Sequence, residues 1–463
     1  MTLRLTAMTA MAMATALAAV EPKDDWTRPQ LHLTPRTGWA NDPNGLVWRN
    51  GEWHFFHQHN PNDIKWGPMH WNHLVSTDLL HWTELGDALK PDALGTMFSG
   101  SAVVDRANSA GFGENAIVLL YTAAGDQVTP KLPYTQCLAH STDGRTFAKF
   151  AGNPVLSCIA EGGNRDPKVF WHKPSRQWVM ALYGQRDGRH AVIVLNSPDL
   201  KRWTEVSTYA GDVVKAGKWL YECPGLEEIG IEGERASAWV VWGAADAYAV
   251  GAFDGRRFTP EEERLPGLAL APGQMPFYAA QTFANVPDGR TLWVAWFRLP
   301  RSPEAAYTHA FSLVEELTLR RTPEGLRLVR RPARELAQLR EGGALPLERF
   351  DGELAEIHLA CRVQPGETAE FDLRGVRLAY DGTARTLTAA GTTVPWSCVN
   401  DELALTVYLD RIGMEIFSDD GLKVMPVAAA RPDRAKRSLS ARTSPGVTDR
   451  RFTAWRLRSI WEN

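Results

Sequence analysis

The sequence predicts an all-β protein: a five-bladed β-propeller followed by a C-terminal β-sandwich. Three observations support this fold class, namely short alternating apolar runs, the near absence of long helical periodicity, and a repeat that returns five times. Typical runs are Trp53-His-Phe-Phe-His, Ile117-Val-Leu-Leu-Tyr and Leu292-Trp-Val-Ala-Trp. Gly, Pro, Asn and Asp separate such runs, which is typical of strands joined by turns.

The repeat consists of two interleaved series. In the first, an Asp precedes an aromatic residue by four positions, at Asp78, Asp143, Asp199 and Asp254. In the second, residues 56, 68, 56 and 56 positions apart open or precede strand-like runs: Asp42, Phe98, Asp166, Glu222 and Tyr278. A unit of roughly 50 residues with several short strands has the period of a propeller blade. Five such units fit between Trp39 and Arg330.

The domain organisation follows from where this repeat ends. We expect the propeller, as the catalytic domain, over residues 28–330, and a linker with the sandwich over residues 331–463. The charged stretch 327–340 suits a connector. Short alternating segments return after Leu345, as in Ala369-Glu-Phe-Asp-Leu, and their spacing favours a sandwich.

The first residues have the pattern of a secretory signal peptide, predicted over residues 1–18. One positive charge near Arg4 precedes an alanine-rich apolar run from Leu5 to Val20, which contains the small-residue site Ala16-Leu17-Ala18. A disordered start or an uncleaved anchor is the alternative. We therefore expect export to the periplasm or the exterior. No later apolar run approaches about 18 residues, so no membrane span is expected in the mature protein.

Charge and composition restrict the partners. Lys and Arg number 51 against 54 Asp and Glu, which leaves no basic surplus for nucleic acid. The 18 tryptophans suit either stacking on sugar rings or packing between sheets. His57 and His59 share a predicted strand face, but no further ligand spacing completes a site, so neither a metal nor a cofactor is expected. The oligomeric state is not predicted.

Five cysteines are too few and too scattered for a disulfide scaffold. Two pairs, Cys137 with Cys158 and Cys361 with Cys398, could form in an oxidising compartment. Cys223 would then remain free.

Three members of the second series are acidic: Asp42, Asp166 and Glu222. The first strand of each blade lines the central channel, so these carboxylates should converge on the propeller axis. Each lies at or just before an X-Pro bond, and proline favours an extended backbone in the preceding residue. Converging like charges raise at least one pKa, and glycosidic cleavage uses two carboxylates whose pKa values differ. We take all three as candidate catalytic residues.

Amide, guanidinium, hydroxyl and aromatic groups accompany the acidic residues. Such a mixture fits a neutral polyol ligand, which needs both hydrogen bonds and stacking. The candidate substrate-binding residues are Asn41, Gln58, Trp66, Phe98, Ser99, Arg165 and Trp296.

At these residues the chain resembles glycoside hydrolase family 32, the β-fructofuranosidases. The motifs are Trp39-Ala-Asn-Asp42-Pro-Asn-Gly, Phe98-Ser99-Gly-Ser, Arg165-Asp166-Pro, Glu222-Cys223-Pro and Asp410-Arg-Ile-Gly-Met-Glu415-Ile-Phe. The resemblance implies that Asp42 is the nucleophile, Glu222 the general acid/base, and Asp166 a carboxylate that hydrogen-bonds fructosyl hydroxyls. The chain departs from the family pattern at Leu313-Val-Glu-Glu-Leu317, which lacks the usual Arg.

The resulting hypothesis is a secreted, retaining β-fructosidase. It would hydrolyse terminal β-D-fructofuranosyl residues of levan or inulin, and sucrose. Two alternatives remain open: a fructosyltransferase of the same fold, and a non-catalytic fructan-binding protein. The preference among levan, inulin and sucrose is not predicted.

Overall fold

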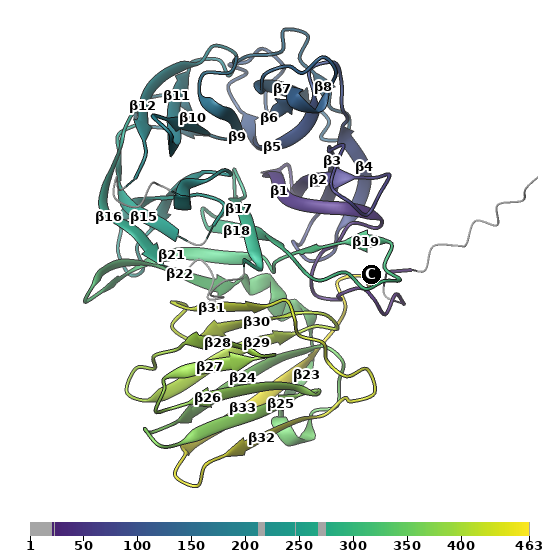
Figure 1. Cartoon of the computed structure of the whole chain (residues 1–463), viewed down its shortest axis with the longest axis vertical. Helices are drawn as coiled ribbons and strands as arrows, with labels where there is room; N and C mark the ends of the chain where they lie inside the picture. The colour runs from purple at the N-terminus through teal and green to yellow at the C-terminus, as the bar shows by residue number, and fades with distance from the viewer. Residues whose placement is uncertain (1–20, 23, 212–217, 246, 267–274, 463) are drawn as a thin grey trace, which may run out of the picture.

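The computed structural model describes residues 21–22, 24–211, 218–245, 247–266 and 275–462. The predicted signal peptide at residues 1–18 lies outside this part of the chain. Among the residues so described, no helix has both the length and the apolar character needed to cross a membrane. The strands there form seven sheets, five in a ring and two stacked below it (Figure 1).

The ring is the propeller, with antiparallel blades built from consecutive strands. Blade 1 contains β1 (Gly38–Arg49), β2 (Glu52–Asn60), β3 (His70–Ser76) and β4 (Thr83–Leu89). Blade 2 contains β5 (Thr96–Asp105), β6 (Ala116–Ala124), β7 (Thr135–Ser141) and β8 (Ala148–Lys149). Blade 3 contains β9 (Glu161–His172), β10 (Gln177–Arg186), β11 (Arg189–Ser197) and β12 (Thr204–Tyr209).

The last two blades have the same order. Blade 4 contains β13 (Gly225–Gly230), β14 (Ser237–Trp242), β15 (Ala247–Phe253) and β16 (Phe258–Pro266). Blade 5 contains β17 (Phe277–Thr282), β18 (Thr291–Phe297), β21 (Glu315–Thr322) and β22 (Gly325–Pro332), with the short β20 (Ala310–Phe311) paired to β18. The ring closes where β19 (Tyr307–Thr308) pairs in parallel with β1.

Two sheets below the ring form the sandwich, so the predicted fold class is confirmed. One sheet has the order β23 (Arg340–Pro346), β33 (Thr448–Leu457), β24 (Ala355–Arg362), β29 (Glu402–Leu409), β30 (Met414–Ser418) and β31 (Val424–Val427). The other has the order β28 (Thr392–Pro395), β27 (Thr386–Ala389), β26 (Val376–Asp381), β25 (Thr368–Leu373) and β32 (Leu439–Thr443). Their facing apolar side chains, such as Ile357 and Phe371, share one core.

The Asp series marks the turn between the third and fourth strands of blades 1 to 4. Asp143 is representative: its Oδ1 accepts the backbone N–H groups of Arg145 and Thr146, at 2.8 and 2.9 Å. The other three make the same pair of bonds, at Asp78, Asp199 and Asp254. The short carboxylate side chain thus closes each turn, which is why Asp recurs there.

Four members of the second series lie in the innermost strand of their blade, and each of these four strands carries a register shift; Glu222 lies just before β13. In β1, Asn41 and Asp42 face the single residue Gln58. In β9, Asp166 and Pro167 likewise face one residue. Similar irregularities occur at Ser99 in β5 and at 279–280 in β17. Such bulges redirect side chains, and here they occur where each strand approaches the axis.

A buried polar cluster joins the two domains. Asp410, which follows β29, accepts the backbone N–H groups of Gln30, Leu31 and His32. The His32 ring lies 2.7 Å from Asp410 through Nδ1 and 3.1 Å from Glu415 through Nε2. Burial alone lowers the pKa of His32, but its hydrogen bonds to both carboxylates raise it to about 9. His32 is therefore held as a cation between the domains.

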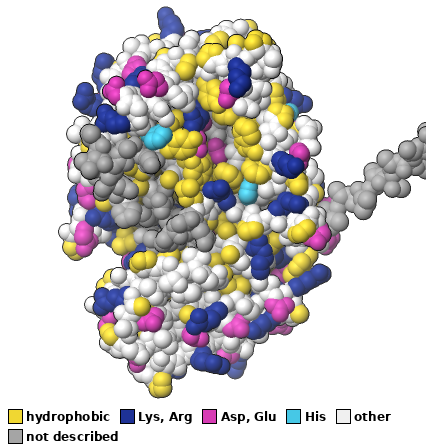
Figure 2. Space-filling model, viewed as in Figure 1, with side chains coloured by type: hydrophobic (Ala, Val, Ile, Leu, Met, Phe, Trp, Pro, Cys, Tyr) yellow, Lys and Arg dark blue, Asp and Glu magenta, His cyan; other side chains and the backbone are white. Residues whose placement is uncertain are grey.

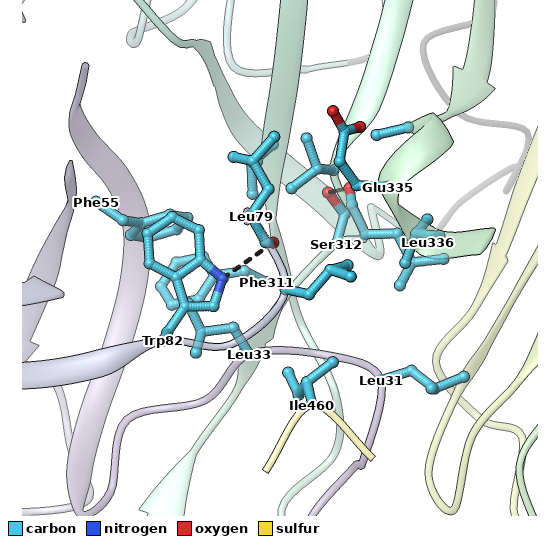
Figure 3. Close-up of a pocket in the computed structure, with 15 residues that line it drawn as sticks. Leu31, Leu33, Phe55, Leu79, Trp82, Phe311, Ser312, Glu335, Leu336 and Ile460 are labelled. Carbon is cyan, nitrogen blue, oxygen red and sulfur yellow. Dashed lines mark hydrogen bonds between the residues drawn. The ribbon is translucent and has the colours of Figure 1, made fainter. Parts of the chain in front are cut away.

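The same junction brings the ends of the described chain together. Ile460 donates its N–H to the Gln30 carbonyl at 2.9 Å, and Ser459 Oγ donates to Gln30 Oε1 at 2.7 Å. Figure 1 places the C-terminus beside the purple N-terminal segment. Beneath it lies a small apolar cavity of about 30 Å³, lined by Leu31, Phe311 and Ile460 among others (Figure 3).

The proposed cysteine pairs are not formed, since all five thiols are free. Cys137 is buried within β7, whereas Cys158 is exposed on a loop, where its thiol donates to the carbonyl of Ala160. The histidines have other partners: His57 Nδ1 contacts the Gln58 carbonyl, and His59 Nδ1 contacts Asp87 at 2.7 Å. No group of three potential ligands suited to a metal ion occurs in the part of the chain that the structure describes.

Candidate active site

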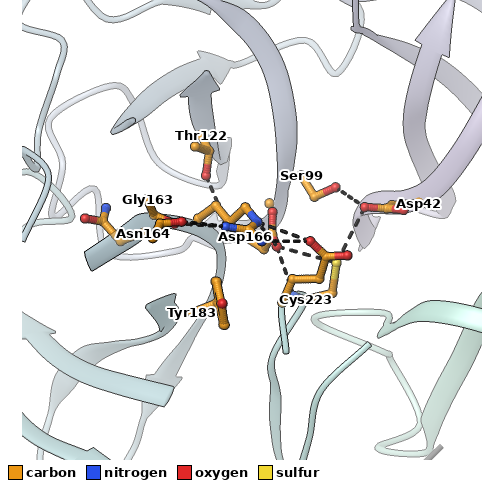
Figure 4. Close-up of polar contacts among 12 residues, drawn as sticks. Asp42, Ser99, Thr122, Gly163, Asn164, Asp166, Tyr183 and Cys223 are labelled. Atoms are coloured by element: carbon orange, nitrogen blue, oxygen red, sulfur yellow. Dashed lines mark hydrogen bonds and ion pairs between the residues drawn. The ribbon is translucent and has the colours of Figure 1, made fainter. Parts of the chain in front are cut away.

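The three predicted carboxylates lie in one cluster of polar contacts, in which Figure 4 labels Asp42 and Asp166 and Arg165 links Asp166 to Glu222. Asp42 comes from β1, Asp166 from β9, and Glu222 from the segment just before β13. Cys223 lies among them: its backbone N–H donates to Asp166 Oδ2 at 2.9 Å, and its Sγ lies 3.5 Å from Asp42 Oδ2 and 3.6 Å from Asp166 Oδ2. Blades 1 and 3 therefore bring one carboxylate each to a single sulfur atom.

Asp42 is held by three neutral donors, of which the Cys223 thiol is the most distant. Ser99 Oγ donates to its Oδ2 at 2.5 Å, and Asn41 Nδ2 donates to its Oδ1 at 3.0 Å. Burial raises the pKa of Asp42, and the negative charge of Glu222 adds to the effect, while the hydrogen bonds oppose it. Its two oxygens are thus fixed in direction by groups that carry no charge.

Glu222 is held differently, by a cation and a phenol. Arg165 Nη2 lies 3.0 Å from its Oε2, and Tyr278 donates its hydroxyl to Oε1 at 2.6 Å. Both oxygens have a donor, and the side chain remains partly exposed. This carboxylate is therefore oriented firmly and still open to a ligand.

Asp166 is the most deeply buried of the three, with 4% of its surface exposed. Burial raises its pKa to about 7, and the charges of Glu222 and Asp42 add to this, while Arg165 opposes it from 3.8 Å. Its own backbone N–H donates to Thr122 Oγ1 at 3.0 Å. Burial is thus the main reason why ionising Asp166 is unfavourable, and the nearby carboxylates add to it.

The backbone prediction at these residues is wrong in part. Proline was expected to keep the preceding residues extended, but Asp166 has a φ of 63° and Cys223 a φ of 46°, both left-handed. Glu222, with a φ of 44°, is left-handed as well. The bulge in β9 and the hydrogen bonds to Thr122 and Asp166 outweigh the local preference. Each such residue costs about 1–3 kcal/mol, a kind of strain that gathers at functional sites.

The predicted substrate-binding residues surround the carboxylates, with one exception. Asn41, Ser99 and Arg165 contact them directly. Trp66, 46% exposed, meets Phe98 edge-on at 5.8 Å, and Trp296 lies 6.0 Å from Tyr278. Gln58 is instead buried behind the Asn41–Asp42 bulge, where its Nε2 donates to the Met97 carbonyl at 2.7 Å.

The sequence prediction missed several members of the site. Tyr278 already belonged to the blade series, so its period could have identified it. Cys223 and Tyr221 flank Glu222 in the sequence. Tyr221 and Tyr183 form an aromatic wall, with the Arg165 guanidinium 5.3 and 4.4 Å from their ring centres. Nothing in the sequence pattern signals the contribution of Tyr183, because only the fold brings β10 beside Glu222.

The surface over this site is hollowed. Figure 2 shows Asp or Glu side chains (magenta) inside a depression on the propeller face, with hydrophobic side chains around it. The arrangement combines oriented carboxylates, neutral donors and aromatic walls, which suits acid–base and nucleophilic chemistry on a neutral, hydroxyl-rich ligand.

Comparisons with known proteins agree on one family. Residues 32–332 match the model of the glycosyl hydrolases family 32 N-terminal domain. A levanase of Bacillus subtilis (strain 168) is 34% identical over 519 aligned positions, covering 98% of this chain and 74% of the levanase. An extracellular exo-inulinase of Meyerozyma guilliermondii is 34% identical, but the match covers 63% of this chain and 59% of that protein.

A solved structure supports the fold. The exo-inulinase from Aspergillus awamori superposes with a TM-score of 0.81 at 24% identity, covering 94% of this chain and 99% of that one. At this identity the likeness concerns the fold, the same propeller and sandwich.

Proposed function

The chain belongs to glycoside hydrolase family 32 and is a glycoside hydrolase of the β-fructosidase type; we propose that it is a secreted, retaining, exo-acting enzyme whose reaction is carried out by Asp42, Asp166 and Glu222. Its proposed substrates are levan or inulin, together with sucrose. The similarity to a levanase and to an extracellular exo-inulinase supports this range.

One observation carries the assignment of roles: Asp42 and Glu222 belong to the same cluster but have different supports. Asp42 accepts hydrogen bonds from a hydroxyl and an amide, so a lone pair can be aimed at carbon without a competing ion pair. Glu222 is partly exposed and oriented by Arg165 and Tyr278. The first environment suits a nucleophile and the second suits a group that exchanges protons with a leaving group and with water.

The proposed reaction has two steps. Asp42 attacks the anomeric C2 of a terminal fructosyl unit while protonated Glu222 gives its proton to the departing glycosidic oxygen, which breaks the C2–O bond and leaves a fructosyl ester on Asp42. Glu222 then takes a proton from water, whose oxygen attacks C2 and releases fructose and the Asp42 carboxylate. Two inversions at C2 give net retention.

Asp166 has a separate role in this proposal. Its carboxylate lies too deep to act as the proton donor and is held by the backbone of Cys223. It would accept hydrogen bonds from ring hydroxyls of the fructosyl unit, together with Arg165. Such bonds fix the sugar against Asp42 and strengthen as positive charge develops on the ring.

A product time course tests the proposal. Purified protein with levan should release fructose alone from the earliest points, as an exo-acting hydrolase does. With methanol present, retention predicts methyl β-D-fructofuranoside as a second product. A ladder of oligosaccharides would contradict exo hydrolysis and favour endo action or fructosyl transfer. No product from levan, inulin or sucrose would contradict the function and favour a binding protein.

A further inference from the structure

A second cavity, of about 720 Å³, opens at the opposite end of the propeller axis. Its position follows from the direction of the innermost strands. β5 carries Ser99 near its start and Val104 at its end, and β9 carries Asp166 and then Trp171. The first residue of each pair faces the carboxylates, and the second lines the cavity. The same strands therefore border the carboxylate cluster at one end and the cavity at the other.

We propose that this cavity is a second, non-catalytic carbohydrate site, which takes a neutral sugar chain with Trp171 as its stacking platform. The chemical class follows from the lining. The identification of this sugar chain as a fructan rests on the proposed function.

Trp171 is an unusual side chain for a surface, since 42% of it is exposed. Its ring meets that of Trp178 edge-on, with centroids 5.1 Å apart. Trp178 is almost fully buried and is fixed by a hydrogen bond from its Nε1 to Ser109 Oγ at 2.9 Å. The buried indole thus holds the exposed one, and a rigid apolar face costs little entropy when a sugar ring stacks on it.

Polar groups lie deeper in the same cavity. Lys168, 4% exposed, places its Nζ 2.6 Å from Thr282 Oγ1 and 3.2 Å from Glu227 Oε2. Thr282 Oγ1 in turn donates to the same Glu227 oxygen at 2.6 Å. Glu227 Oε1 accepts no hydrogen bond from any residue that the structure describes. A free carboxylate oxygen in a cavity is an acceptor for a sugar hydroxyl.

The charge of the lining excludes a strongly ionic ligand. Its formal charges are nearly balanced, with Arg106, Lys168, Lys173 and Arg290 against Asp105, Glu227 and Glu228. Lys168 is compensated by Glu227, and Arg290 by three carboxylates that include Glu335. A volume of this size lies within the range of about 300–1,000 Å³ that holds small ligands. A neutral, hydroxylated ring fits both the charge and the size.

Such a site would matter only for long substrates. A polymer held at the back of the propeller raises the local concentration of chain ends near the carboxylates. Sucrose is too short to reach both the carboxylates and the second cavity. The proposal therefore predicts that loss of the second site weakens binding of the polymer and leaves the hydrolysis of sucrose unchanged.

The test is native gel electrophoresis in gels containing levan or inulin, with Asp42→Ala as the background so that the polymer is not digested. Adding Trp171→Ala should raise the apparent Kd for the polymer by about tenfold, the loss of one stacking contact. Trp171→Phe should fall between the two. Val399→Ala, an exposed apolar residue on the sandwich, should behave as the background does.

Hydrolysis provides the second readout. With Asp42 intact, Trp171→Ala should hydrolyse sucrose at the normal rate and lose rate on dilute levan. If the polymer retards the Trp171→Ala variant as much as the background protein, the second site is overturned, whichever substrate the enzyme hydrolyses. Retardation that depends on Trp171 in a wild-type protein that cleaves nothing would overturn the proposed function and leave the second site standing.

Discussion

Two buried clusters in this molecule place carboxylates around a single cation, and they are supported in opposite ways. In the cluster between the domains, Asp410 accepts four backbone N–H groups and the ring of His32. In the cluster on the propeller axis, Asp166 accepts one backbone N–H, from Cys223, and shares Arg165 with Glu222, whereas Asp42 has only neutral donors. In this cluster Asp166, Glu222 and Cys223 have a left-handed backbone, whereas His32, Asp410 and Glu415 of the first cluster do not.

From this difference we infer different roles for the two clusters. Backbone donors satisfy the buried oxygens of Asp410, and the His32 ring joins Asp410 to Glu415, so we infer that the interdomain cluster stabilises the fold. A cluster with surplus acids and few donors is costly to maintain and is ready to exchange protons or attack a ligand. Variants of the two clusters should therefore separate activity from stability.

The largest effect should come from Asp42→Ala. If Asp42 forms the covalent intermediate, kcat for sucrose should fall at least about 10⁴-fold. The protein should unfold at no lower temperature than the wild type, because burial already disfavours the charge of this carboxylate. Fructose release and thermal unfolding measure the two quantities. Substantial residual turnover would contradict the nucleophile assignment.

His32→Ala should show the reverse. Two buried carboxylates would lose their cation, which costs about 3–5 kcal/mol of the free energy of unfolding, while kcat of the folded protein should be unchanged. The folded-state pKa of His32 is raised to about 9 from 6.5. Its stabilising contribution is therefore complete below pH 6.5 and is lost as the pH rises through 9.

Denaturant titrations across this pH range measure the effect, and the variant should lack the decline between pH 6.5 and 9. His358→Ala, a half-exposed histidine on β24, is the matched control. A similar loss of stability in the control would refute a special role for the interdomain cluster.

Ser99→Ala should have an intermediate effect, confined to the reaction. The variant removes one of the three donors that orient Asp42, worth about 1.5–3 kcal/mol for a bond to a charged group. We expect kcat to fall by about 10- to 100-fold with a smaller change in KM. Ser99→Thr keeps the hydroxyl and should restore most of the rate. Loss of rate in both variants alike would point to packing rather than to the hydrogen bond.

The smallest of the four expected effects is the change in the stability of Asp166→Asn. The folded-state pKa of Asp166 lies near 7 against an ordinary 3.8, so the folded state holds the extra proton and loses stability as the pH rises from about 4 to 7. Asparagine has no charge to bury, and the variant should unfold a few degrees higher than the wild type at pH 7. The gain should vanish near pH 4.

Asp254→Asn is the control of opposite sign. Backbone N–H groups of Arg257 and Arg256 lower the pKa of this turn carboxylate. Its contribution to stability is present at neutral pH and is lost as the pH falls, so the variant should be less stable at pH 7. If both variants change the stability at pH 7 in the same direction, the contrast between the buried Asp166 and the hydrogen-bonded Asp254 is refuted.

Much of the fold and the centre of the site were predictable because both depend on short-range rules repeated at one period. The Asp of each outer turn closes its own loop, and the members of the inner series occupy equivalent places in successive blades. The bulges at Asn41–Asp42 and Asp166–Pro167 were not predictable, because they occur where the innermost strands of different blades pack together around the axis. For the same reason, the extended backbone expected before proline was wrong at Asp166 and Cys223.

The interdomain cluster lay beyond sequence reasoning for a different reason. His32 and Asp410 are separated by 378 residues, and neither lies in a repeat that would relate them. The Tyr183 ring beside Glu222 has the same origin, since only the folded blade 3 presents it. Contacts of this kind are decided by tertiary packing alone.

The hydrogen bonds of Gln30 with Ser459 and Ile460 have a consequence for biosynthesis. The segment around Gln30 leaves the ribosome 429 residues before its partner Ser459. Asp410, its other anchor, follows Gln30 by 380 residues. A nascent chain can therefore complete individual blades during translation, while the junction between propeller and sandwich must wait until these distant partners have been synthesised.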